Sequence, residues 1–170
     1  RYFAYPFDEE KLKAELNQTL AELEPSTDYR LRISIAKSGK VSYQLDKLQA
    51  LPEAFCKAIL VPQNADLQQP FTYFKTSYRP HLSLGQQEQI YYNAQGQLLE
   101  SSIGNLVLQL DGHLYTPPVE LGLLDGIYRQ HLLATGQATE RILSLDDLKS
   151  AEKIYACNAL RGLYELEIDD

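Results

Sequence analysis

Four leucines near the start of the chain repeat at intervals of three and four residues: Leu12, Leu16, Leu20 and Leu23. This spacing places apolar side chains on one face of a helix. The acidic Asp8 and Glu9 precede it, where negative charge favours the positive end of a helix dipole. The pattern therefore predicts an amphipathic helix that ends before Pro25.

The pattern changes to strict alternation from Tyr29 onward. Residues 29–35 and 41–45 each alternate apolar and polar side chains, and Ser38-Gly39 between them can form a tight turn. These segments predict a β-hairpin, and residues 58–61 predict a third strand. Residues 62–70 are rich in Gln, Asn and Pro and poor in aliphatic side chains, which indicates a linker.

The second half of the chain predicts a second group of strands. Residues 89–93 predict one strand, and residues 105–110 with residues 114–115 predict another hairpin. Pro117-Pro118 would end that sheet, because proline cannot donate to a β-ladder.

Two helices are expected before the carboxyl end returns to extended structure. Residues 123–133 can form one helix, closed by Gly136, and residues 146–153 can form another. Ser144 and Asp147 have the spacing of a capping box, in which each side chain bonds the backbone N–H of the other.

The order of these elements predicts an α+β protein with two lobes. Residues 1–69 would form a small lobe with its linker, and residues 70–170 would form a larger, strand-rich lobe. A cleft between two lobes is a common place for a ligand site.

Composition and charge narrow the class of protein. The chain has 170 residues, 44% hydrophobic and 23% charged, so it can bury a core and is not expected to be disordered. It carries 16 Lys and Arg against 23 Asp and Glu without a basic cluster, which argues against nucleic-acid binding. No apolar run is long enough to span a membrane and no secretory leader is visible, so we expect a cytoplasmic protein.

The metal-binding residue types are too scattered to predict a metal site. Cys56 and Cys157 lie far apart and lack C-x-x-C spacing, which favours reduced thiols over a disulfide or zinc site. The three histidines, His81, His113 and His131, have no partner at the spacing that would place two ligands on one helix face.

Four segments of the second half carry the functional signal, because the common hydrolase, P-loop, dinucleotide and metalloprotease motifs are absent. The segments are KTSYR at residues 75–79, ESSIGNL at 100–106, TPP with GLLDGIYR within 116–129, and CNALRG at 157–162. In this order and spacing they resemble the class IV aminotransferase family of pyridoxal-phosphate enzymes. The resemblance covers nearly the whole chain and implies the two-lobed fold of that family, with the active site between the lobes.

Lys75 stands at the position of the family's cofactor-binding lysine. The resemblance implies that it binds pyridoxal 5'-phosphate covalently, which requires an amine that can lose its proton. Four aromatic residues near it in the sequence predict a partly buried site: Phe71, Tyr73, Phe74 and Tyr78. Arg79 would contact the cofactor or a substrate carboxylate, with an ordinary surface ion pair as an equal alternative.

The resemblance assigns the remaining cofactor contacts. Glu100 matches the family acid five residues before an asparagine, here Asn105, and would bind the pyridine nitrogen and keep it protonated. The cofactor phosphate would bind at the start of the predicted helix, where backbone N–H groups are free, and at a second turn. The residues implied for this phosphate cup are Gly126, Ile127, Tyr128, Asn158 and Ala159.

Within the family, the CNAL sequence at residues 157–160 resembles the aminodeoxychorismate lyase branch. Branched-chain aminotransferases carry Gly-Thr in place of Asn158-Ala159. The implied reaction releases pyruvate from 4-amino-4-deoxychorismate and leaves 4-aminobenzoate for folate synthesis. One alternative is an aminotransferase for branched-chain or D-amino acids, and another is a non-catalytic domain that retains the fold. The implied partners are a second copy, as a homodimer, and a chorismate-using synthase subunit, fused or separate.

One part of the family pattern is missing from the chain. The small-lobe arginine that also holds the cofactor phosphate would lie several residues before Arg1. The sequence also contains no Met and begins at Arg1, so we expect it to be a piece of a longer polypeptide.

Overall fold

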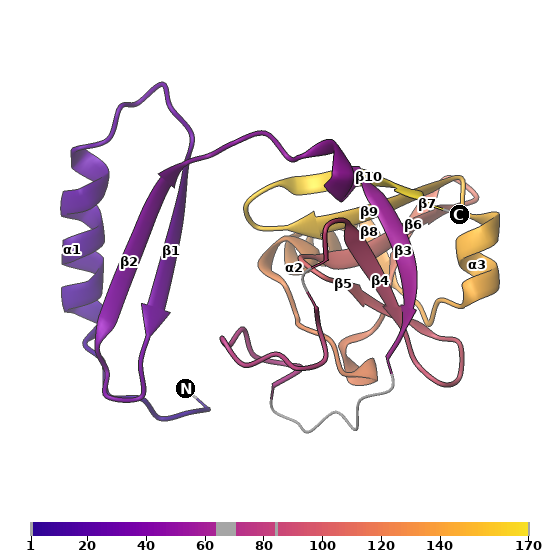
Figure 1. Cartoon of the computed structure of the whole chain (residues 1–170), viewed down its shortest axis with the longest axis horizontal. Coiled ribbons are helices and arrows are strands. Elements are labelled where there is room, and N and C mark those ends of the chain that lie inside the picture. Colours follow the sequence, from indigo (N-terminus) through magenta and orange to yellow (C-terminus); the bar gives the residue numbers. More distant parts are fainter. Residues whose placement is uncertain (1, 64–70, 84, 170) are drawn as a thin grey trace. The chain divides into compact units, whose positions relative to one another are not determined.

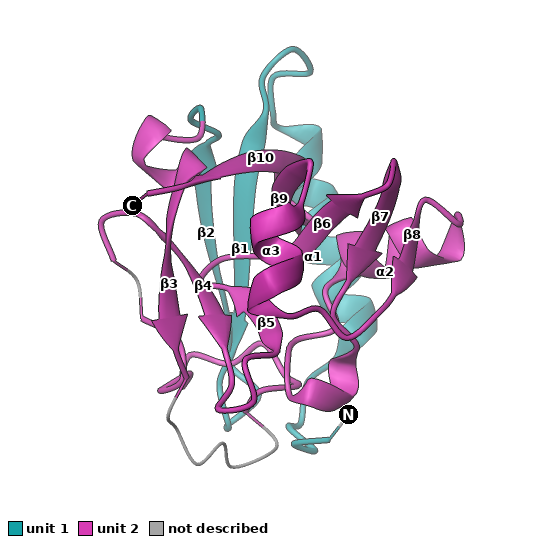
Figure 2. Cartoon of the chain, turned by 90° about the vertical axis from the view of Figure 1, so that its right-hand side faces the viewer, with its two compact units in different colours: residues 1–50 teal, residues 51–170 magenta. Residues whose placement is uncertain are grey.

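The computed structural model describes residues 2–63, 71–83 and 85–169. The chain divides into two compact units, residues 1–50 and residues 51–170 (Figure 2). This division replaces the boundary near residue 70 that the sequence predicts. The strand at residues 57–62 hydrogen-bonds to strands of the second unit, so it belongs there. Most of the predicted linker, residues 64–70, lies outside the described residues.

The first unit is a helix beside a two-stranded antiparallel sheet (Figure 1). It consists of α1 (Glu9–Ala21), β1 (Tyr29–Ile35) and β2 (Val41–Lys47), which confirms the predicted helix and hairpin. The helix begins where the sequence predicts because Lys11 N donates to Asp8 Oδ1 at 3.0 Å.

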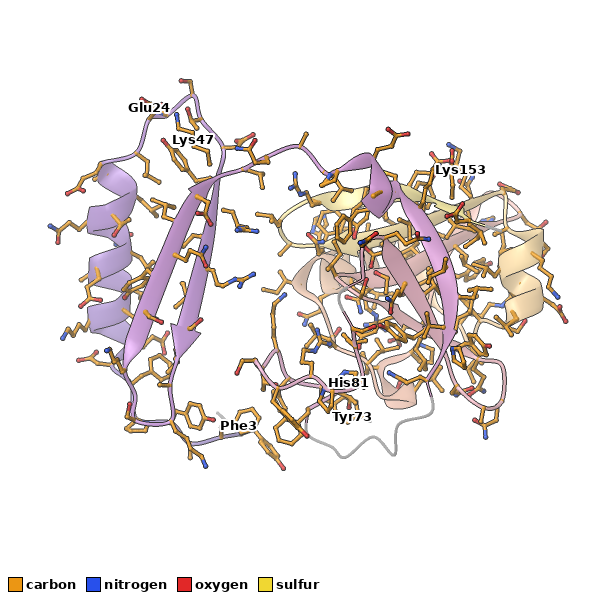
Figure 3. The ribbon with its side chains drawn as sticks, viewed as in Figure 1. Phe3, Glu24, Lys47, Tyr73, His81 and Lys153 are labelled. Carbon is orange, nitrogen blue, oxygen red and sulfur yellow. The ribbon has the colours of Figure 1, made fainter. Side chains whose placement is uncertain are left out.

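Side chains join these elements of the first unit. Tyr43 on β2 donates to Glu15 on α1 at 2.6 Å. Lys47 Nζ at the end of β2 lies 3.7 Å from Glu24 Oε2, and Figure 3 labels both side chains. The hairpin turns at Gly39, whose φ of +82° favours glycine.

The described part of the second unit contains eight strands. In chain order they are β3 (Lys57–Pro62), β4 (Glu88–Tyr92), β5 (Leu98–Ser101), β6 (Asn105–Leu110), β7 (His113–Thr116), β8 (Ala138–Glu140), β9 (Lys153–Asn158) and β10 (Gly162–Ile168). Their order in the sheet is β5-β4-β3-β10-β9-β6-β7-β8. One further pairing, between Glu100 and Asn105, joins β5 to β6 and closes six of the strands into a ring.

The core of the second unit takes buried residues from every strand of this ring. The buried residues on the ring strands include Ala58, Ile90, Leu98, Leu106, Leu108, Ala156 and Leu166. The opposite faces of β6 and β9 present Val107 and Cys157, which pack with Leu132. Because side chains alternate across a strand, neighbouring residues on β6 and β9 serve two separate apolar clusters.

The helices of the second unit are short. They are η1 (Glu53–Cys56), η2 (Val119–Leu121), α2 (Ile127–Ala134) and α3 (Leu145–Ser150). The predicted capping box is confirmed at α3, where Asp147 N donates to Ser144 Oγ and Ser144 N donates to Asp147 Oδ2. Among the described residues, no helix is long and apolar enough to cross a bilayer.

Two predicted helices are shorter than the sequence suggests. The helix predicted over residues 123–133 begins only at Ile127, because Gly122 adopts a φ of +90° and Gly126 is extended. The helix predicted over residues 146–153 ends at Ser150, because Lys153 begins a strand that pairs with β6 and β10. In the second case, the strand β9 takes the residue that the helix would need.

The two cysteines provide a test of the burial in this fold. Cys56 is half-buried, whereas Cys157 is buried and its burial raises the pKa of its thiol to about 11. A thiol reagent at about pH 8 should therefore modify Cys56 in the native chain and spare Cys157. In denaturant both thiols should react. Fast native labelling of a Cys56→Ser variant would contradict the position of Cys157 in the core.

Candidate active site

Lys75 lies on the segment between β3 and β4 and is exposed. The partly buried environment predicted from its aromatic neighbours is not observed. The Phe71 and Tyr78 rings instead pack on each other edge to face, with centroids 5.1 Å apart. Thr76 Oγ1 donates to the Tyr78 carbonyl at 2.7 Å and shapes the turn that follows Lys75.

Glu100 is the buried acid of this region. Its strand β5 is buried along its whole length, and only 4% of the Glu100 side chain is exposed. Arg79 Nη2 donates to both carboxylate oxygens, at 3.2 and 3.3 Å. Arg79 therefore forms an ion pair with the buried Glu100 rather than a surface ion pair.

His81 is a second group beside Glu100, and the sequence leaves its role open. Its Nε2 lies 3.8 Å from Glu100 Oε1, and its ring lies among the side chains of the second unit (Figure 3). Burial, followed by the charge of Arg79, lowers the pKa of His81. At neutral pH the ring is therefore uncharged, so Arg79 is the cation that holds Glu100.

The charges around Glu100 act in opposite directions. Burial raises the pKa of Glu100 to about 7, while Arg79 and, more weakly, Lys75 lower it. Arg79 contacts Glu100 directly, and Lys75, on the same segment as Arg79, is near enough for its charge to act on this carboxyl. Removing Arg79 would favour the protonated acid.

The start of α2 has no side-chain cap. Gly126 is its N-cap, so among the described residues no capping side chain accepts from the first N–H groups of the helix. Asn105 Nδ2 donates to the Leu124 carbonyl at 2.6 Å and fixes the approach to the helix. A Cβ atom on residue 126 would collide with Asn105 Oδ1, so this close approach requires glycine.

The turn between β9 and β10 lies against the start of α2. Asn158 Oδ1 accepts from Leu160 N at 3.0 Å and from Arg161 N at 2.9 Å, which shapes the turn. Gly162 closes it with a φ of +69°, and an added Cβ there would be 3.4 Å from the Tyr128 ring. The structure thus brings together the two parts of the predicted phosphate cup, while the exposed Ala159 lies on the same turn.

Arg129 is a buried residue whose role the sequence does not reveal. Its guanidinium donates to Asp125 Oδ1 at 2.9 Å, to the Pro117 carbonyl at 2.9 Å and to Glu140. These bonds tie the first turn of α2 to the loop before it and to β8. A lone arginine on a helix has no sequence signal that would distinguish this role from surface exposure.

The family model for class IV amino-transferases matches residues 1–166. The chain therefore belongs to the class IV aminotransferase family, whose members depend on pyridoxal phosphate.

The individual relatives include proteins named as lyases and proteins named as aminotransferases. A candidate aminodeoxychorismate lyase from Schizosaccharomyces pombe is 28% identical over 146 residues, which are 78% of this chain and 63% of that protein. The structure of a candidate amino-acid aminotransferase from Mesorhizobium loti is 30% identical, with a TM-score of 0.85 over 99% of this chain and 85% of that one. The chain spans less than two thirds of the curated relatives that it matches.

Another solved structure shows the same fold with the cofactor. An aminotransferase from Brucella abortus bound to pyridoxal phosphate is 16% identical, with a TM-score of 0.65 over 94% of this chain and 67% of that one. The residues of this chain fit such a group, because the first turn of α2 has no side-chain cap at Gly126 and Glu100 offers a buried acid. The predicted α+β fold of this family is confirmed.

The burial of Glu100 predicts a pH dependence of stability in the cofactor-free chain. Its pKa is higher in the folded state than the ordinary 4.5, so the folded state binds more protons between about pH 4.5 and 7. The free energy of unfolding should fall as pH rises through this window, by about 3 kcal/mol at most, and then level off. Urea unfolding of Glu100→Gln across the same window should show a weaker decline.

Glu167→Gln is the matched control, because Glu167 is an exposed carboxylate on β10 of the same unit. Its stability should follow the wild-type pH dependence. If Glu100→Gln also follows it, the carboxyl of Glu100 does not titrate in the folded state as its burial requires.

Proposed function

We propose that the protein is a pyridoxal-phosphate-dependent lyase that releases pyruvate from 4-amino-4-deoxychorismate and leaves 4-aminobenzoate for folate synthesis. The observation that carries this choice is the turn at Asn158, where the asparagine side chain accepts from two backbone N–H groups. The surrounding CNAL sequence resembles the lyase branch. The similarity to the S. pombe protein, itself named as a candidate lyase, supports the same choice.

Three groups of this chain would hold the cofactor. Lys75 would bind it covalently, Glu100 would accept from its pyridine N–H, and the start of α2 with the Asn158 turn would bind its phosphate. When bound, pyridoxal phosphate supplies a ring that withdraws electrons from the carbon bearing the substrate amine. Arg79 supports this arrangement because its ion pair favours the charged form of Glu100.

The reaction needs one group that moves a proton, and Lys75 Nζ is suited to it. With substrate bound at the site, Lys75 Nζ would take the proton from the ring carbon that bears the substrate amine. The electron pair completes the aromatic ring as the bond from the ring to the enolpyruvyl oxygen breaks. The enolpyruvyl group takes up a proton and leaves as pyruvate, so the two products contain all atoms of the substrate.

An aminotransferase is the second candidate. It is favoured by the 30% identity to the M. loti protein, which is named as a candidate amino-acid aminotransferase. The same Lys75 and Glu100 would serve that reaction, but it also requires a second half-reaction with a keto acid.

The assignment of Lys75 is tested by reduction with borohydride in the presence of pyridoxal phosphate. We expect the reduced cofactor to be attached to Lys75 and to be located there by peptide mapping. The Lys75→Ala variant should carry no label, while Glu100→Gln should still be labelled because it retains the amine. A label on another lysine of the folded protein would make the assignment wrong.

The reaction is tested with the full-length protein and 4-amino-4-deoxychorismate. Pyruvate and 4-aminobenzoate should appear in equal amounts. A coupled dehydrogenase measures the pyruvate, and fluorescence measures the 4-aminobenzoate. The Glu100→Gln variant should be slower by about 100-fold, because the pyridine nitrogen loses its anionic partner. Conversion of 2-oxoglutarate to glutamate with an amino-acid donor, without pyruvate release, would favour the aminotransferase.

A further inference from the structure

Glu88 is a buried carboxyl group that none of the assignments above uses. It begins β4 and is 0% exposed. Its Oε1 accepts from Ser102 Oγ at 2.6 Å and from Ile103 N at 3.1 Å. Burial raises the pKa of Glu88, and these hydrogen bonds lower it. A buried carboxyl is costly unless it is hydrogen-bonded, and the two bonds to Oε1 offset part of this cost.

Both donors to Glu88 belong to the turn between β5 and β6. Within this turn, Ser101 N donates to the Gly104 carbonyl at 2.9 Å, and Gly104 N donates to Ser101 Oγ at 3.1 Å. The turn also lies against β9, because a Cβ on Gly104 would lie only 2.7 Å from the Cys157 carbonyl oxygen. Glu88 therefore bonds a turn that is also closely confined by β9.

Three parts of the candidate site are attached to this turn. Glu100 precedes it directly on β5. Asn105 follows it directly and bonds the Leu124 carbonyl before α2. Asn158 Nδ2 donates to the Ile103 carbonyl at 3.3 Å, which ties the second part of the phosphate cup to the residue whose N–H bonds Glu88.

We propose that Glu88 is a positioning residue for the cofactor site, acting through its hydrogen bonds to Ser102 and Ile103. This inference rests on the proposed function, since it concerns the site that would bind pyridoxal phosphate. Among the described residues, the side-chain hydrogen bonds of Glu88 go to Ser102 and Ile103, which are not among the predicted cofactor contacts. Its effect passes through the turn to Glu100, to the start of α2 and to Asn158.

Two substitutions of Glu88 distinguish the role of its hydrogen-bond acceptor from the role of its negative charge. Glu88→Gln keeps an oxygen that can accept from Ser102 and Ile103, whereas Glu88→Ala removes it. Hydrogen exchange of the Ile103 amide should accelerate about tenfold or more in Glu88→Ala and stay within about threefold in Glu88→Gln. Spectral titration should show about tenfold weaker binding of pyridoxal phosphate to Glu88→Ala and near-normal binding to Glu88→Gln.

Glu152→Ala is the matched control. Glu152 Oε1 accepts from Gly112 N at 3.1 Å, so it also holds a turn by one backbone N–H, but at the opposite end of β6. Its removal should change neither the Ile103 exchange nor the cofactor affinity. If Glu88→Ala does not fold, Ser102→Ala removes one of the two donors and should produce smaller changes of the same kind.

The two measurements distinguish the possible failures. Unchanged Ile103 exchange and unchanged affinity in folded Glu88→Ala would overturn the inference. Faster exchange with unchanged affinity would also overturn it, because the turn would then be held without consequence for the cofactor. If the wild-type chain binds no pyridoxal phosphate while Glu88→Ala still accelerates Ile103 exchange, the proposed function fails, and the positioning of the turn stands.

Discussion

The close contact between the β5–β6 turn and the backbone of β9 is the constraint on which the candidate site depends. Gly104 has no room for a side chain because the Cys157 carbonyl lies against it. The same turn allows Glu100 to pair with Asn105, and this pairing closes the ring of six strands around a shared core. A ring leaves no free edge between β5 and β6, so the residues beside the turn have little freedom to move.

Glu100 connects this ring to the segment that carries Lys75. Its carboxylate is bonded by Arg79 and lies beside His81, and both residues follow Lys75 within the same segment. One guanidinium nitrogen of Arg79 reaches both carboxylate oxygens, at 3.2 and 3.3 Å, and this contact offsets part of the cost of burying the Glu100 charge. The acid predicted to hold the cofactor ring therefore also attaches the lysine segment to the sheet.

Local sequence patterns predicted the elements whose signals are contained within a few residues. The leucine repeat of α1 and the alternation of β1 and β2 are such signals, and the Ser144 and Asp147 spacing correctly predicted the cap of α3. The sequence pattern does not predict strand β5. All four of its residues are buried, Leu98, Leu99, Glu100 and Ser101, so apolar and polar side chains do not alternate along it. The predicted end of α3 is wrong, because the strand pairing of Lys153 with β6 overrides the local helix preference.

The sequence by itself determined the family, through four spaced motifs, and with it the identity of the candidate site residues from Lys75 to Ala159. Tertiary structure alone decided how these residues are supported. Arg79 meets Glu100 across 21 positions of sequence, and Glu88 meets Ser102 across 14. Neither pair has a local pattern, because burial and hydrogen bonding between residues far apart in sequence arise only in the folded chain. A motif can therefore identify the chemistry, whereas the fold determines which carboxyl groups are buried and which partners hold them.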